Sequence, residues 1–304
     1  MLLRSPYISH FSYYGIVTCQ LPFCVNCITV TVMHVHRLSL LLLAPLALPG
    51  QVIPIAVHGP LTVVSVQLNG QGPFRMIIDT GASSCSIAPR VASLLRLSAE
   101  YSVLNVTPNG KRLTPGIRSV EVKLGTRIAK NVAFLSQESR GLTEAGVEVD
   151  GVLGQSLLSR FDYLLDYKSG QLVLDSPEGQ SAGTPGKQIK FTRVAGRMLL
   201  TAMNPAEGNM RLILDSAASN VFLWRGGDYQ VRGMTASLIA MSGRRAVNLI
   251  RMPLLVVGDQ ALQRLDVVVA PSPDEGREED GLLPAGLFRS IYVSNSETYV
   301  KLRQ

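Results

Sequence analysis

An eight-residue pattern occurs twice in this chain of 304 residues, once in each half. The first copy is Met-Ile-Ile-Asp-Thr-Gly-Ala-Ser at 76–83, and the second is Leu-Ile-Leu-Asp-Ser-Ala-Ala-Ser at 212–219. Each copy leads an apolar strand into an aspartate, Asp79 or Asp215, that precedes a hydroxyl residue and a residue with little or no side chain. Such a repeat can bring two carboxylates face to face, where they share one proton and can activate water.

The residues around the two copies repeat with the same spacing. Gly72 and Gly208 each stand seven residues before their aspartate, so the hairpins that feed the aspartates have equal length. Further along, each half passes through an apolar segment into Asp-Gly-apolar-Leu, at 150–153 and at 280–283. Equal spacing over this length predicts that the chain contains a duplicated β domain.

These motifs resemble those of the aspartic proteases, both the two-lobed pepsin-like kind and the retropepsin kind. Asp79-Thr80-Gly81 is similar to the catalytic triplet of the family, and Val-Leu-Gly at 152–154 is similar to its second signature. The resemblance extends over roughly 52–304. It implies an all-β, two-lobed fold, built from a duplicated β domain with few short helices.

The resemblance also assigns roles at the site. Asp79 and Asp215 are the expected catalytic pair, in which one takes a proton from water while the other donates to the scissile carbonyl. Neither role belongs to one aspartate, because the pair titrates together. The hydroxyls of Thr80 and Ser216 are expected to bridge the two loops, and Gly81 to permit close approach of the backbone.

The second copy departs from the family pattern. Ala217 stands where the family has glycine, and Pro284 stands where the second signature ends in glycine. Two functions therefore remain open: an aspartic endopeptidase acting through both lobes, or a non-catalytic peptide-binding protein on the same fold. Pairing of the first lobe with the first lobe of another chain ranks last, because the second half fills that surface. A monomer is expected.

Two glycines mark the expected flaps over the substrate. Gly110 and Gly243 follow short polar segments, and each precedes a further glycine by fifteen residues. Both are predicted to lie at hairpin tips that close over an extended peptide, which would bind as an added strand. The segment around Gly110 has no tyrosine, so this flap resembles the glycine-tipped retropepsin kind.

Composition and turn signals outline the domains. We expect a leader at 1–50, a first lobe at 51–175, a linker rich in Gly, Ser and Pro at 176–187 and a second lobe at 188–304. Strands are predicted at Leu61–Leu68, Val120–Leu124 and Gln171–Leu174, and helices at Pro89–Leu97 and Gln155–Arg160.

The first fifty residues are predicted to target the chain. From Met33 a basic segment ending at Arg37 precedes an apolar run at 38–48, which indicates a signal peptide at 33–50 and a secreted or periplasmic protein. Residues 1–32 fit a mis-assigned start. An uncleaved leader that anchors the protein is the alternative, but the run is short for a membrane span, so stable insertion is not expected.

Several classes of function are disfavoured. All four histidines lie at the N-terminal end, which argues against a Ser-His or Cys-His hydrolase and a histidine metal site, so neither metal nor cofactor is expected. The formal net charge is +7, but the basic residues are scattered without interleaved aromatics, so nucleic acid is not an expected partner. Cys85, alone after the leader, is expected to be buried, Trp224 is expected to pack in the second lobe, and the acidic run 274–280 is expected to form a solvated loop.

Overall fold

The computed structural model describes residues 50–144, 146–175, 186–225, 235–240, 243–272, 274 and 276–304. They belong to one compact unit, Ala47–Gln304. The leader expected at 1–50 lies outside the described residues apart from Gly50. The linker expected at 176–187 lies outside them apart from Gly186 and Lys187. Both boundaries stay predictions.

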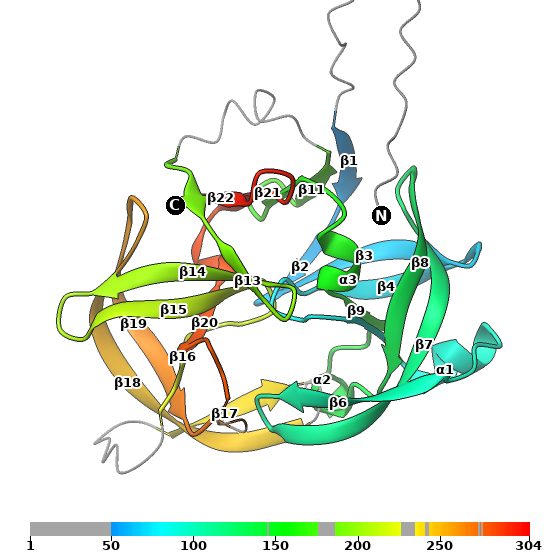
Figure 1. Ribbon diagram of the computed structural model, residues 1–304, viewed down its shortest axis with the longest axis horizontal. Helices are drawn as coiled ribbons and strands as arrows, with labels where there is room; N and C mark the ends of the chain where they lie inside the picture. Colours follow the sequence, from blue (N-terminus) through cyan, green and yellow to red (C-terminus); the bar gives the residue numbers. More distant parts are fainter. Residues whose placement is uncertain are drawn as a thin grey trace, which may run out of the picture. The chain divides into compact units, whose positions relative to one another are not determined.

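Two eight-stranded sheets carry most of the fold (Figure 1). The first follows the order β2-β3-β4-β9-β5-β8-β7-β6, with β2 Ala56–His58, β3 Leu61–Leu68, β4 Gln71–Ile78, β9 Gly151–Leu153, β5 Cys85–Ile87, β8 Arg127–Ser136, β7 Gly110–Leu124 and β6 Tyr101–Thr107. The second follows the order β13-β14-β15-β20-β16-β19-β18-β17, with β13 Thr192–Val194, β14 Arg197–Asn204, β15 Gly208–Asp215, β20 Gly281–Pro284, β16 Val221–Trp224, β19 Gln260–Ala270, β18 Gly243–Val257 and β17 Thr235–Ala240.

The two sheets correspond strand by strand. Each position in the first order has a counterpart in the second, and the additional pairing of β3 with β7 matches that of β14 with β18. The strand that leads to each aspartate pairs in parallel with the strand of the second signature, β4 with β9 and β15 with β20. This topology agrees with the duplication inferred from the sequence, and the predicted all-β, two-lobed fold is confirmed.

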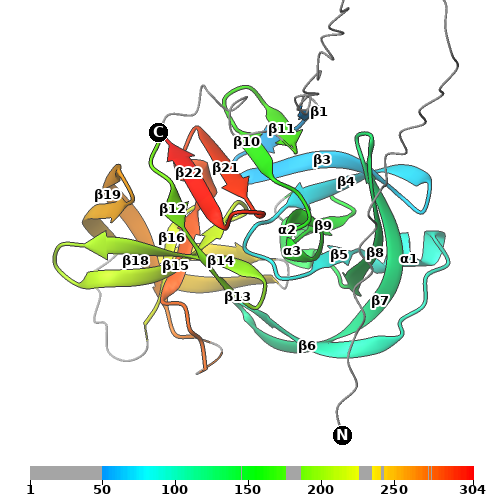
Figure 2. The ribbon, with the colours of Figure 1, turned by 45° about the horizontal axis from the view of Figure 1, so that its top comes forward.

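A third sheet of six strands joins the lobes. Its order is β1-β11-β10-β21-β22-β12, with β1 Gln51–Pro54, β11 Gln171–Leu174, β10 Tyr163–Asp166, β21 Ser290–Ser294, β22 Tyr299–Arg303 and β12 Ile189–Lys190. Figure 2 shows β10 and β21 side by side, where the halves meet through an antiparallel register of Tyr163 with Val293. Because each half supplies three neighbouring strands, the sheet fixes one lobe against the other.

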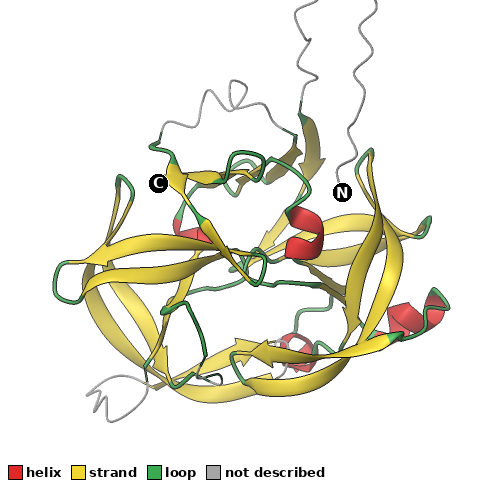
Figure 3. Cartoon of the chain, in the orientation of Figure 1, coloured by secondary structure: helices red, strands yellow, loops and turns green. Residues whose placement is uncertain are grey.

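Helices are short, as Figure 3 shows. The described residues contain α1 Pro89–Leu94, α2 Arg140–Glu144, α3 Gln155–Leu158 and the 3-10 turn Ala285–Leu287. The helix predicted at Pro89–Leu97 ends early because Arg96 adopts a positive φ of 53°, which closes the last turn. The helix predicted at Gln155–Arg160 also ends earlier, at Leu158, and α2 was not anticipated.

The strands before the aspartates lie deep in the core. Met76, Ile77 and Ile78 of β4 are buried, and so are the last residues of β15. Three apolar residues in a row, instead of alternation, are typical of a strand covered on both faces. Burial on both sides holds each strand end rigidly. The positions of the two aspartates, which stand at these strand ends, are therefore fixed. The predicted strands Leu61–Leu68 and Gln171–Leu174 coincide with β3 and β11, whereas Val120–Leu124 is the end of the longer β7.

Candidate active site

Asp79 and Asp215 stand at equivalent ends of the two central strands. Asp79 follows β4, and its backbone amide donates to the carbonyl of Leu153 at 3.0 Å. Asp215 ends β15 and is paired in register with Pro284. Each aspartate is therefore held beside the second signature of its own lobe.

The two carboxylates are held by the same pattern of hydrogen bonds. Oδ1 of Asp79 accepts from the amides of Gly81 and Ala82, both at 2.9 Å. Oδ1 of Asp215 accepts from the amides of Ala217 at 2.8 Å and Ala218 at 3.0 Å. The methyl group of Ala217 thus leaves the loop hydrogen bonds of its lobe intact.

Thr80 and Ser216 bridge the two loops at their base. The amide of each donates to the hydroxyl oxygen of the other at 3.0 Å. The Thr80 hydroxyl donates to the carbonyl of Leu214 at 2.8 Å, and the Ser216 hydroxyl donates to the carbonyl of Ile78 at 2.7 Å. Both side chains are fully buried. Four crossed hydrogen bonds in a dry environment fix the separation and the tilt of the two loops.

Gly81 lies directly against the carboxyl group of Asp215. A Cβ atom at Gly81 would stand 2.5 Å from Cγ and 2.6 Å from Oδ2 of that aspartate. The absence of a side chain therefore lets the first loop approach the carboxylate of the second lobe. In the other lobe, Ala217 packs its methyl group against an apolar cluster of the first lobe, named here the apolar wall and composed of Leu61, Val63, Ile77, Leu142, Val149 and Val152.

The surroundings raise the pKa of both aspartates. Burial is the main cause for each, and for Asp79 the nearby charge of Asp215 adds to it. The hydrogen bonds from the loop amides and the positive charge of Arg197 lower the pKa of both, but do not cancel the increase. The pair therefore retains a shared proton well above the pH at which a free aspartate ionises. One neutral and one charged carboxyl group, side by side, can supply an acid and a base together.

Two long hairpins meet over this site. Gly110 and Gly243, predicted at the flap tips, begin β7 and β18 with φ angles of 137° and 131°. Asn109 donates from Nδ2 to the carbonyl of Gly243 at 2.9 Å, so the tips touch where β6 and β17 approach each other in Figure 1. Next to the first tip, Nζ of Lys111 pairs with Asp274 of the second lobe at 2.8 Å.

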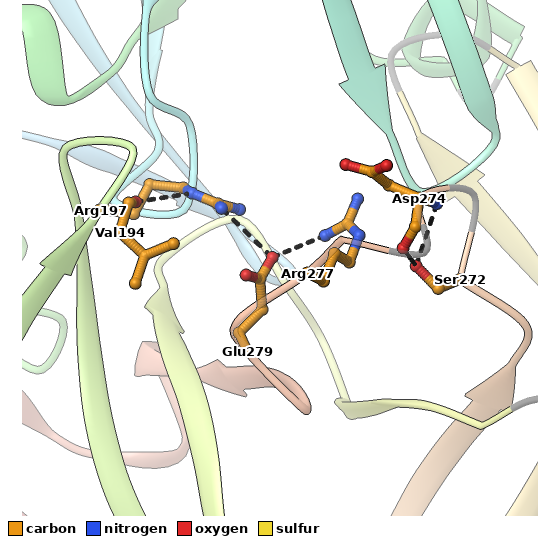
Figure 4. A network of polar contacts seen from close by, with 6 residues as sticks. All are labelled: Val194, Arg197, Ser272, Asp274, Arg277 and Glu279. Carbon is orange, nitrogen blue, oxygen red and sulfur yellow. Dashed lines mark hydrogen bonds and ion pairs between the residues drawn. The ribbon is translucent and has the colours of Figure 1, made fainter.

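A charged cluster flanks Asp215 in the second lobe. Leu199 pairs with Ile213, and two further residues along each strand place Arg197 opposite Asp215. Arg197 pairs through Nη2 with Glu279 at 3.2 Å, and Glu279 also pairs with Arg277 at 2.7 Å (Figure 4). Glu279 is only 4% exposed, so the prediction that 274–280 forms a solvated loop is wrong for this residue, although Gly276 and Glu278 are exposed. Burial of that carboxylate is balanced by two guanidinium groups.

Sequence reasoning singled out the residues at the aspartates but missed those around them. The structure gathers Asp79, Thr80, Gly81 and their second-lobe counterparts at the lobe boundary, while Gly110 and Gly243 lie at hairpin tips. Asn109, Lys111, Arg197, Arg277 and Glu279 were not identified. The only available signal for Arg197 was its place eighteen residues before Asp215, where the first lobe has Leu61 before Asp79.

Cys85 and Trp224 lie where the sequence predicts them. Cys85 is buried, as expected, and burial raises the pKa of its thiol to about 11. Trp224 packs in the second lobe, with its ring 4.3 Å from that of Phe222. The described part of the chain contains no group of three or more potential metal ligands. It also contains no helix with the length and apolarity needed to cross a membrane.

Comparisons with known proteins agree with this architecture. Residues 64–157 match a family model described as aspartyl protease. Of the solved structures, 215 chains match significantly. A retropepsin-like aspartic protease from Rickettsia conorii is 22% identical, with 41% of this chain and 88% of that chain covered and a TM-score of 0.32. Basic 7S globulin from soybean is 9% identical, with 84% and 96% covered and a TM-score of 0.51, a likeness of fold alone. No curated protein matches significantly.

Proposed function

We propose that the chain is an aspartic endopeptidase that cleaves peptide bonds with water activated between Asp79 and Asp215, from the premise that residues 64–157 match a family model described as aspartyl protease. The observation that carries the proposal is the crossed pairing of Thr80 with Ser216, which holds two equivalent aspartate loops together at the lobe boundary. A preorganised pair of this kind keeps the reacting water in place without further reorganisation.

The raised pKa of the pair supports the same chemistry. With one proton shared, the charged carboxylate accepts a proton from water while the neutral one donates to the carbonyl oxygen of the scissile bond. When the intermediate breaks down, the aspartate that took the proton from water gives it to the leaving amine, and the other aspartate regains a proton from a hydroxyl of the intermediate, so the pair returns to its starting state. Both carboxylates come from one chain, which supports a monomer as the working form.

The substrate proposed is an extended peptide beneath the two hairpins. The hairpin tips at Gly110 and Gly243 are joined by Asn109 and must separate to admit it. A peptide bound as an added strand would gain main-chain hydrogen bonds from the flaps, while its side chains would enter pockets on either lobe.

A non-catalytic peptide-binding protein is the second candidate, and it is favoured by Ala217 and Pro284. Against it, Ala217 still donates its amide to Asp215 at 2.8 Å, as Gly81 does to Asp79. The endopeptidase therefore remains the better supported function.

The cellular location is also a proposal. The basic segment that ends at Arg37 and the apolar run at 38–48 support export to the periplasm or the medium. Retention at a membrane by an uncleaved leader is the alternative. N-terminal sequencing of the exported protein, expressed from the full chain, distinguishes the two.

The proposed activity is tested by digestion of a peptide library, with products identified by mass spectrometry. The wild-type protein is compared with Asp79→Asn and Asp215→Asn, which keep the size of each side chain. Cleavage by the wild type and none by either variant is the expected result. Binding of peptides without cleavage by the wild type favours the second candidate. Full activity in Asp215→Asn would contradict the two-lobed mechanism.

A further inference from the structure

The residues beside the two aspartates differ in chemistry between the lobes. In the first lobe, Leu61 lies opposite Asp79, since Val63 pairs with Ile77 in β3 and β4. Leu61 belongs to the apolar wall, and so does Val149, the residue before the Asp-Gly of the second signature. Ala82 and Ala217, which follow the two aspartates, both pack against this wall, so it borders the site.

The second lobe has charged residues at the corresponding places. Arg197 replaces Leu61 opposite Asp215, Glu279 replaces Val149, and Arg277 replaces Val147 three residues before the Asp-Gly. Arg197 and Arg277 both bind Glu279, and their side chains are 16% and 11% exposed. The guanidinium of Arg277 also lies over the ring of Trp224, 4.2 Å from its centroid. The charged wall, Arg197, Glu279 and Arg277, holds two positive charges and one negative charge, and it lies next to the negative charge of the aspartate pair and of Asp274.

This wall has donors without acceptors. Nε of Arg277 and Nε1 of Trp224 are buried, and no residue in the described ranges accepts a hydrogen bond from either. A buried donor without a partner is unfavourable, so a ligand that supplies an acceptor is favoured there. Because both orphaned groups are donors, the matching ligand group is an acceptor, and a carboxylate is the acceptor that pairs best with the guanidinium of Arg277.

A further arginine lies on the flap above. Arg245 is two residues from the tip at Gly243 and on the same face of β18 as Val247, because side chains alternate along a strand. Val247 is buried in the cluster against which Trp224 packs. Nε and Nη2 of Arg245 are buried, and they too have no acceptor within the part of the chain that the structure describes. Arg245 therefore adds two further orphaned donors, on the hairpin of the second lobe.

We propose that the charged wall is a specificity subsite for an acidic side chain of the substrate, next to the bond that is cleaved. The apolar wall would receive an uncharged, apolar side chain on the other side of that bond. Arginine suits this role because its planar group binds carboxylates through two parallel hydrogen bonds. The inference rests on the proposed function, since it names the substrate class of the same site.

The test uses peptide pairs of one fixed length that are identical except for Glu or Gln at one position, which is moved along the peptide. The C-termini are amidated, and a matching set with free C-termini distinguishes a side-chain carboxylate from the end of the chain. Cleavage is measured as kcat/KM with the wild type. Binding is measured with the inactive Asp79→Asn protein, so that recognition is observed even where cleavage fails.

The wild type is expected to prefer Glu over Gln by about tenfold or more at one position close to the cleaved bond, as for a hydrogen-bonded charge. Arg277→Gln is expected to abolish that preference, while Arg197 still pairs with Glu279. Glu279→Gln removes the compensating charge and is expected to increase the preference. Arg251→Gln, which alters an exposed arginine of β18 paired with Asp266, serves as the matched control and should keep it.

A Glu-to-Gln ratio is insensitive to a general loss of folded protein, because both peptides are measured on one sample. Cleavage without any preference for Glu overturns the subsite and leaves the endopeptidase standing. Preferential binding of Glu peptides without cleavage supports the subsite and overturns the endopeptidase. A ratio unchanged in both Arg277→Gln and Glu279→Gln, or a preference that requires a free C-terminus, also overturns the subsite.

Discussion

The amide of Thr80 donates to the hydroxyl of Ser216 at 3.0 Å, and the amide of Ser216 returns the same bond to Thr80 at the same length. Each hydroxyl then donates to a carbonyl beneath the opposite aspartate. The side chains of Thr80 and Ser216 each hydrogen-bond to the backbone of the opposite lobe, so the geometry of each aspartate depends on the sequence of the other half.

This bridge gives the first prediction. Thr80→Val keeps the shape of the side chain but removes the hydroxyl, so a buried amide and a buried carbonyl lose their partners. We expect a loss of about 1–3 kcal/mol in the free energy of unfolding and a reduced rate of cleavage. Ser216→Ala should behave alike, and the loss in the double variant should differ from the sum of the two, because both residues belong to one hydrogen-bond network. Denaturant unfolding measures the change in stability, and kcat measures the change in rate. If Thr80→Val had the stability and kcat of the wild type, the bridge between the loops would not contribute to catalysis.

The second prediction concerns the third position of the two triplets. Gly81→Ala would place a methyl group 2.5 Å from Cγ of Asp215, so the loops must move apart. We expect a loss of about 1–3 kcal/mol in stability and loss of activity. Ala217→Gly should cost only about 1 kcal/mol, mainly by removing one methyl group from the apolar wall. If Gly81→Ala and Ala217→Gly changed stability and activity equally, the predicted difference between the two loops would be wrong.

The motifs predicted the fold because each reports a local constraint. Asp-Thr-Gly after a run of apolar residues specifies a buried strand that ends in a tight turn, and its repetition at equal spacing specifies two lobes. Contacts between residues that are far apart in the sequence have no comparable local motif. Nothing adjacent to Glu279 in the sequence marks it as buried, since its partner Arg197 lies more than eighty residues earlier.

At the two hairpin tips, too, the sequence predicted the local turn but not the contact between distant segments. Glycines with turn residues before them predicted the tips at Gly110 and Gly243, because a positive φ is a local property. That Asn109 reaches across to Gly243 depends on how the lobes are joined through the third sheet. Local signals therefore located the parts of the site, and tertiary structure alone determined their neighbours.

The third prediction links the aspartate pair to stability. Because burial raises the pKa of both groups, the folded chain holds a proton that the unfolded chain releases near pH 4. The contribution of the pair to stability is therefore complete below that pH and declines as pH rises, until the pair ionises in the folded state. Asp79→Asn should abolish cleavage yet be more stable than the wild type near pH 7, with equal stability near pH 3. Denaturation at both pH values tests this, and a variant that is less stable at pH 7 would contradict it.

The fourth prediction concerns the joined flaps. Asn109→Ala removes the side-chain hydrogen bond to Gly243 but leaves the hairpin backbone unchanged. We expect a several-fold change in KM for peptides, with less than about 1 kcal/mol change in stability, because a single hydrogen bond near the surface contributes little. Asn105→Ala, in the same hairpin but paired with Gln137 of the first lobe, is the control and should leave KM unchanged. An equal effect of both variants would indicate general loosening of the hairpin.

The fifth prediction is the pH dependence of cleavage. Only Oδ1 of each aspartate accepts hydrogen bonds from the described loop residues, and Ala82 and Ala218 have no hydroxyl to donate to the outer oxygen. A missing donor favours the neutral form and adds to the increase in pKa caused by burial, which Arg197 only partly offsets. The optimum for cleavage is therefore expected in mild acid or near neutrality, where one proton remains on the pair.

Replacing both Ala82 and Ala218 by serine should supply the donors, lower the pKa of the pair and move the rate profile to lower pH. The single variant Ser83→Ala, which alters a neighbouring hydroxyl, is the control. An optimum of the wild type in strong acid, or a profile that the two serines leave in place, would show that other groups determine the protonation of the pair.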